Sequence, residues 1–268
     1  MSITFNVALV QCPIAHLQPE VNLQKAEEYI QKAAVQNAQV IVFPEDFMTG
    51  SIFGDTRHLD RNENFRQKFQ ALAKKYAIDI VTGSWMEETD SGNYNNSTYI
   101  DAQGNVLGVY SKNHLYLSEG HFLKAGTDVP VFETKYGKAA MIICWDIMYP
   151  EIFARMVKQG VQIVYCPSYW YNEIAGAGLA LNPNCEADQL DALCVTRAVE
   201  NNVAFVYCNP AGSMSFPNGS TDTLVGHSQI TLPIAGPIAR MNHNREEMIV
   251  QSVDLSFLDL AKTEYQLV

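Results

Sequence analysis

Short, mostly apolar runs recur along this chain of 268 residues, and segments with helical periodicity separate many of them. The clearest runs lie at residues 40–43, 139–144, 161–166 and 203–208. A run of this length with little polar alternation is typical of a strand that is buried on both faces. Because such strands need helices as outer layers, the pattern predicts a layered α/β fold.

The helical segments lie approximately at residues 22–34, 62–76, 150–160 and 184–198. Asn22 and Asn184 are the expected N-caps of the first and the last, and Pro150 suits the first turn of the third. Two short strands around residues 101–105 predict a β-hairpin, so the sheets are expected to be mixed. Since no linker or repeat interrupts this order, residues 1–268 are expected to form a single domain.

Composition and charge exclude several classes of partner. With a formal net charge of -11, the chain is disfavoured as a binder of nucleic acid or of an anionic membrane surface. No apolar stretch approaches the length of a membrane span, and the first residues lack the basic segment of a signal peptide. The six cysteines show no Cys-x-x-Cys spacing, which indicates reduced thiols and a cytoplasmic location.

Three residues with complementary chemistry follow predicted strands. Cys144 ends one apolar run, Glu45 follows another, and Lys112 follows the second strand of the hairpin. Because strand ends of an α/β fold meet at one edge of a sheet, these side chains are expected to converge there. Cys144 also lies just before the helix start at Pro150, where backbone N–H groups favour an anion and hence a reactive thiolate.

Each of these residues alone has a more ordinary interpretation, as a core cysteine, a solvated turn glutamate or a surface lysine. Other catalytic patterns find little support. His114 and His121 have no ligand at metal-binding spacing nearby, so neither a metal nor another cofactor is expected. There is no Gly-x-Ser-x-Gly motif, and a papain-like pair of Cys144 with His114 lacks its local signature.

Seven segments, in order along the chain, resemble the motifs of the carbon–nitrogen hydrolase (nitrilase) superfamily, and the likeness extends over nearly the whole chain. Among them, Phe43-Pro44-Glu45 is similar to the glutamate motif of that family, the stretch from Tyr110 to Leu115 to its lysine motif, and Cys144-Trp145-Asp146 to its cysteine motif. The others lie at residues 7–11, 119–126, 197–201 and 226–236. The resemblance implies an αββα four-layer sandwich with mixed sheets.

The resemblance also implies roles for the residues at the strand ends. Cys144 would attack a carbonyl or nitrile carbon, with Glu45 as the general base. Lys112 and the backbone N–H of Trp145 would stabilise the oxyanion of the tetrahedral intermediate. Glu119 would orient Lys112 or position the substrate nitrogen, while Trp145 itself is equally consistent with a packing role.

The activity expected from the resemblance is that of an amidase, which converts a small amide to an acid and ammonia through a thioester. A carbamoyl-amine hydrolase and a nitrilase are alternatives, although true nitrilases usually have Glu where this chain has Asp146. An acyltransferase would share the thioester. A non-catalytic interaction module is less consistent with charges kept around a thiol. A homodimer or a higher homo-oligomer is expected from the resemblance and from the low charged fraction of 18%.

The segment after the strand at residues 161–166 carries Tyr169, Trp170 and Tyr171, followed by Glu173. The resemblance implies that these aromatic side chains face the substrate, and packing against a partner subunit is the equally weighted alternative. Arg155 is expected to pair with Glu151 on its own helix, so no arginine is available to clamp a substrate carboxylate. A neutral or amine-bearing acyl group is therefore expected in preference to an acidic one.

Overall fold

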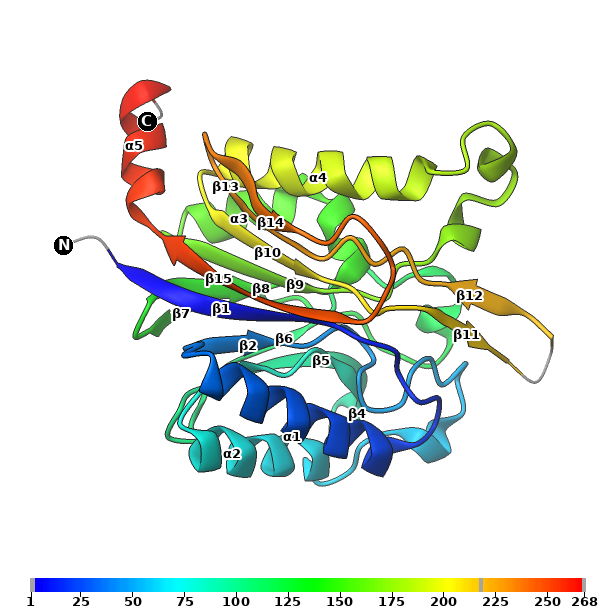
Figure 1. Cartoon of the computed structure of the whole chain (residues 1–268). Coiled ribbons are helices and arrows are strands. Elements are labelled where there is room, and N and C mark those ends of the chain that lie inside the picture. The colour runs from blue at the N-terminus through cyan, green and yellow to red at the C-terminus, as the bar shows by residue number, and fades with distance from the viewer. Residues whose placement is uncertain (1–2, 217–218, 267–268) are drawn as a thin grey trace.

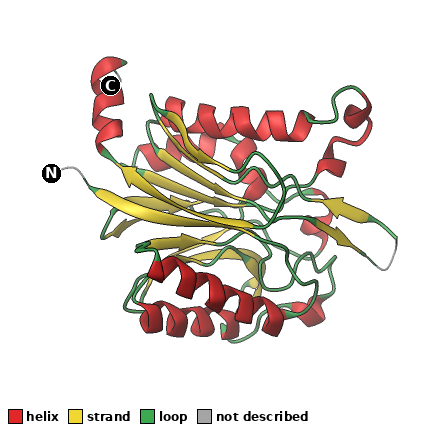
Figure 2. Cartoon of the chain, viewed as in Figure 1, coloured by secondary structure: helices red, strands yellow, loops and turns green. Residues whose placement is uncertain are grey.

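The computed structural model of the chain describes residues 3–216 and 219–266. Two β-sheets pack face to face, and helices cover their outer faces (Figure 1). The strands occupy the middle of the molecule and most of the long helices lie outside them (Figure 2). The four-layer αββα arrangement predicted from the sequence is thus confirmed.

The first sheet has seven strands in the order β15-β1-β2-β3-β5-β4, with β6 paired to β5. Only β1, β2 and β3 run parallel to one another, and the remaining pairs are antiparallel. The strands are β1 (Thr4–Gln11), β2 (Val40–Val42), β3 (Asp79–Val81), β4 (Trp85–Thr89), β5 (Gly92–Ile100), β6 (Val106–Ser111) and β15 (Glu247–Asp254).

The second sheet has six strands in the order β14-β13-β10-β9-β8-β7, with β8, β9 and β10 parallel. A separate hairpin, β11 (Ser213–Ser215) and β12 (Thr221–Thr223), extends from one end of the sandwich (Figure 1). The strands of the second sheet are β7 (Val131–Thr134), β8 (Gly137–Met141), β9 (Ile163–Pro167), β10 (Ala204–Cys208), β13 (Gln229–Leu232) and β14 (Gly236–Arg240).

Helices α1 (Pro19–Val35) and α2 (Asn64–Tyr76) cover the first sheet, and α3 (Pro150–Val157) and α4 (Cys185–Asn201) cover the second (Figure 1). Successive side chains of β1 point to opposite faces of the sheet, and from Val7 to Val10 both sets are apolar, so the strand is buried on both faces. Val7 and Leu9 point into the core between the sheets, whereas Ala8 and Val10 pack with the residues of α1 and α2. A further helix, α5 (Ser256–Glu264), follows β15.

The prediction that Asn22 caps the first helix is wrong. Helix α1 begins earlier, at Pro19, because proline fits the first turn, and Asn22 is fully buried inside the helix. Its side chain exchanges two hydrogen bonds of 2.8 Å with the backbone of Ala15 and donates another to Met48. Asn184 does precede α4, but its side chain makes no capping hydrogen bond.

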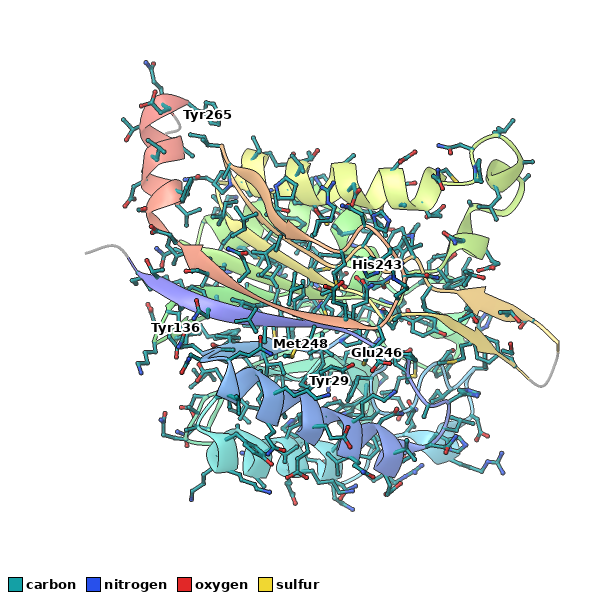
Figure 3. All side chains as sticks on the ribbon, in the orientation of Figure 1. Tyr29, Tyr136, His243, Glu246, Met248 and Tyr265 are labelled. Carbon is teal, nitrogen blue, oxygen red and sulfur yellow. The ribbon has the colours of Figure 1, made fainter. Side chains whose placement is uncertain are left out.

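Long-range contacts fasten the helical layer to the first sheet. Tyr29 of α1 points toward Glu246, just before β15, and donates a hydrogen bond of 2.5 Å to its carboxylate (Figure 3).

Within the described residues, no helix has the length and apolar character needed to cross a bilayer. The same part of the chain holds no group of three or more potential metal ligands.

Candidate active site

The structure brings the predicted carboxylates, ammonium and thiol together around one cavity, which Asp222 of β12 also lines. Glu45 follows β2, Lys112 follows β6, and Cys144 follows β8. Lys112 Nζ lies 3.0 Å from Oε1 of Glu45 and 2.9 Å from Oε2 of Glu119, and the lysine side chain is only 2% exposed. One buried ammonium therefore links both glutamates.

Cys144 occupies a strained turn between β8 and α3. Its φ of 48° lies in the left-handed region, which costs a non-glycine residue about 1–2 kcal/mol. A short 3₁₀ turn, Cys144–Met148, separates the strand from α3, so the cysteine begins a helical turn whose first N–H groups lack partners within it. The Trp145 N–H is one of these groups.

The buried side chain of Asp146 holds this turn in place through hydrogen bonds. Its fully buried carboxylate accepts hydrogen bonds from the N–H of Ile143 at 3.1 Å and from the hydroxyl of Tyr110 at 2.7 Å. It also accepts the backbone N–H of His114 at 2.8 Å and lies 2.9 Å from Nδ1 of that histidine. The segment that carries Lys112 is thereby connected to the segment that carries Cys144.

Glu45 is fixed through both of its carboxylate oxygens. Asn95 of β5 donates to Oε1 at 2.9 Å, and the backbone N–H of Tyr169 donates to Oε2 at 2.8 Å. Since Lys112 also contacts Oε1, the carboxylate has little rotational freedom. The carboxylate is therefore held in one orientation beside the cavity that Cys144 also lines.

The electrostatics differ from the expectation of a preformed thiolate. Burial raises the pKa of the Cys144 thiol well above its usual value, and the charge of Glu45 raises it further, while Lys112 opposes the shift. Burial likewise raises the pKa of Glu45, with Lys112 opposing and Glu119 adding to the effect. Burial lowers the pKa of Lys112, but Glu45 and Glu119 outweigh it and raise that pKa well above normal. The shift of Cys144 therefore favours the neutral thiol over a preformed thiolate.

A cavity of about 120 Å³ opens onto these groups. Tyr169 and Tyr171 line it, as does Trp145, and so does Ile174 from the following turn. Trp170 is not among its lining residues, because this side chain is fully buried behind Trp145, with ring centroids 5.3 Å apart. The indole N–H of Trp170 donates instead to Glu186 of α4 at 2.6 Å.

Acidic side chains outnumber basic ones around the cavity. Of the described residues that line it, Lys112 is the only cationic one, whereas Asp46 and Asp222 add two carboxylates that sequence reasoning missed.

The expected ion pair between Arg155 and Glu151 does not form. Arg155 donates to the carbonyl of Thr127 at 2.7 Å, since the loop before β7 lies within its reach. Glu151 faces Nε2 of His114 at 3.7 Å instead.

Residues 6–263 match the family model described as carbon-nitrogen hydrolase. The chain is 30% identical to a probable nitrilase from Schizosaccharomyces pombe, over 93% of this chain and 89% of that protein. It is 29% identical to a 2-oxoglutaramate amidase from Bacillus subtilis, over 94% and 91% of the two chains. It is also 29% identical to an N-carbamoylputrescine amidase from Arabidopsis thaliana, over 91% and 84%.

The fold has solved counterparts as well. The crystal structure of Saccharomyces cerevisiae Nit3, a member of branch 10 of the nitrilase superfamily, superposes with a TM-score of 0.85 at 25% identity. The superposition covers 99% of this chain and 96% of that one. The likeness therefore extends to both sheets and to the helices on either side of them.

Proposed function

The chain belongs to the carbon–nitrogen hydrolase family, and from this premise we propose that it hydrolyses the C–N bond of a small amide through a thioester on Cys144. The observation that carries the proposal is the buried Lys112 ammonium, which contacts Glu45 and Glu119 at the mouth of a cavity that Cys144 also lines. A thiol, a base and an oxyanion-stabilising cation are the groups that acyl transfer needs.

In the first half of the reaction, Glu45 accepts the thiol proton while Sγ of Cys144 attacks the carbonyl carbon. A concerted transfer fits a thiol whose pKa is raised, because no thiolate has to stand alone before the attack. The negative charge that develops on the carbonyl oxygen is stabilised by Lys112 and by the backbone N–H of Trp145.

In the second half, Glu45 gives its proton to the leaving nitrogen, the C–N bond breaks, and ammonia departs from the acyl-enzyme. Water then transfers a proton to Glu45 and attacks the thioester, which releases the acid and returns the proton to Cys144. Glu119 acts in this scheme as a positioning residue, because its carboxylate holds Lys112 2.9 Å away.

A carbamoyl-amine hydrolase is the second candidate, and the similarity to N-carbamoylputrescine amidases favours it. The same residues would act on a ureido carbon without a change in mechanism. A nitrilase is less consistent with this chain, because true nitrilases usually have Glu at the position of Asp146.

The test is ammonia release from a panel of short amides, ureido compounds and nitriles, repeated with hydroxylamine. Amide turnover with hydroxamate formation is expected, since hydroxylamine intercepts a thioester. Release from nitriles alone, or hydroxamate without hydrolysis in water, would favour a nitrilase or an acyltransferase respectively.

We further infer that residues 1–268 act as one domain in a cytoplasmic homodimer. One apolar core between the two sheets supports the single domain, and six free cysteines support a reducing compartment. Light scattering at micromolar concentration should give about twice the 29.9 kDa mass of the chain, and a monomeric mass would contradict the dimer.

A further inference from the structure

We propose that the cavity selects substrates with a primary ammonium group at the far end of a short chain, and that Asp222 and Asp46 receive this group. The inference rests on the proposed amide hydrolysis and adds the substrate class. It is carried by the placement of the two carboxylates around the cavity and by the hydrogen-bonding state of Asp46.

The first argument is a charge imbalance in the cavity. Four carboxylates line it, and Lys112 is the only cation among the described lining residues. Glu45 and Glu119 already share that cation, at 3.0 and 2.9 Å. Asp46 and Asp222 therefore lack a cationic partner in the cavity, and a cationic substrate would supply one.

The second argument is the state of Asp46. Asp46 is only 5% exposed and lines the cavity, yet its buried Oδ1 has no hydrogen-bond partner among the described residues. The backbone holds it there in the left-handed region, with a φ of 54°. A buried carboxylate oxygen without a donor is costly, so a site that retains one is prepared for a donor from a ligand.

The third argument concerns distance. Asp222 belongs to β12, and its carboxylate accepts the hydroxyl of Tyr169 at 3.2 Å. The backbone N–H of the same tyrosine donates to Glu45. Tyr169 therefore spans the cavity from the proposed base to Asp222, and the substrate needs a linear chain of comparable length between its reacting carbon and its ammonium group.

Burial disfavours the charged form of both carboxylates. Burial raises the pKa of Asp222 to about 6, with Tyr169 opposing and Glu173 adding to the shift. Burial, followed by the charges of Glu45 and Glu119, raises the pKa of Asp46 well above its usual range. An ammonium ion would stabilise the ionised form of both groups, whereas a substrate carboxylate would be repelled.

Matched substrates isolate the ammonium group. δ-Aminovaleramide and hexanamide differ only in an ammonium group replacing a methyl group, and N-carbamoylputrescine and pentylurea form the corresponding ureido pair. In each pair that is turned over, kcat/KM should be at least ~10-fold higher for the ammonium member. The pair with the larger values distinguishes an amide from a ureido substrate, and glutaramate should be the poorest of the amides.

The variants assign the effect to residues. In Asp222→Asn the amide can still accept the Tyr169 hydroxyl, but the ratio within each pair should fall toward one, as it should in Asp46→Asn. Glu173→Gln is the matched control. This acid lies near Asp222 and accepts the N–H of Thr223 at 2.8 Å, but it is not among the lining residues, so the ratio should be retained.

Equilibrium binding separates this inference from the catalytic proposal. With Cys144→Ala, calorimetry should show tighter binding of δ-aminovaleramide than of hexanamide, and Asp222→Asn in the same background should remove the difference. If the ammonium member binds no better, the inference is wrong even where amides are hydrolysed. If it binds better but no amide is turned over, the substrate class stands and the proposed reaction does not.

Discussion

Two regions of the second sheet place buried thiols near the ends of neighbouring strands, with different results. Cys144 follows β8, while Cys166 and Cys208 lie at the ends of β9 and β10. Burial raises the pKa of all three thiols. Cys208 Sγ donates to the carbonyl of Val10 at 3.1 Å, and Cys166 Sγ lies 3.6 Å from the Ser168 hydroxyl.

Only Cys144 of these three combines a left-handed backbone, a carboxylate–ammonium pair and a cavity. The comparison teaches that neither burial nor the pKa of the thiol identifies a nucleophile in this fold. What distinguishes Cys144 is the adjacent carboxylate of Glu45, which in the proposed reaction takes the proton as the bond to carbon forms.

The largest expected effect is the loss of the nucleophile. Cys144→Ala should lower kcat/KM by at least ~10⁴-fold, because the thioester can no longer form. Cys166→Ala and Cys208→Ala, the matched controls, should keep kcat/KM within about threefold, because neither thiol lines the cavity. Steady-state ammonia release measures all three, and circular dichroism checks that each is folded. Comparable losses of kcat/KM in all three variants would show that Cys144 does not differ in function from Cys166 and Cys208.

The next prediction concerns the ion pair that sets Cys144 apart. Glu45→Gln and Lys112→Ala should each lower kcat/KM by ~10³-fold or more, because one removes the base and the other the oxyanion cation. Residues that act as a unit are not additive, so a Glu45→Gln, Lys112→Ala and Cys144→Ala triple variant should be little worse than the poorest single one. Single-turnover measurements would reveal additive losses, which would contradict a shared role.

A smaller effect is expected in the pH profile. Glu45 must be ionised to accept the thiol proton, so kcat/KM should fall as the pH drops through its raised pKa, above the ordinary glutamate value of about 4.3. Glu119 contributes to that rise through its charge. Glu119→Gln should therefore move the acid limb to lower pH, and an unmoved limb would show that Glu119 does not act on Glu45 electrostatically.

Features of the fold and the site that depend on local sequence patterns can be predicted from the sequence, whereas features that depend on contacts between distant residues cannot. Glu45, Lys112 and Cys144 follow strands whose apolar runs are visible locally, so their convergence at one edge could be predicted. The αββα fold and the family resemblance are confirmed in the same way, since ordered motifs span the chain. The catalytic roles inferred from the resemblance stay predictions until the variants are measured.

Other parts depend on contacts that no local pattern encodes. No continuous apolar run marks strand β4, whose Glu87 carboxylate is nevertheless buried against Arg66 at 2.7 Å. Asn95 similarly reads as a turn residue but supports Glu45 from inside the sheet. Asp222 reaches the cavity only because the β11–β12 hairpin packs against the loop that carries Tyr169.

The smallest expected effect concerns stability, for which Cys208 should matter more than Cys144. Cys208→Ala should lower the free energy of unfolding by about 1–2 kcal/mol, because it leaves a small cavity between the sheets and removes the donor to Val10. Cys144→Ala should cost less, since its thiol borders a cavity. Urea denaturation of the two variants, compared at equal m-values, gives both numbers. If Cys144→Ala proved the more destabilising of the two, Cys144 would be a core residue that happens to lie beside an ion pair.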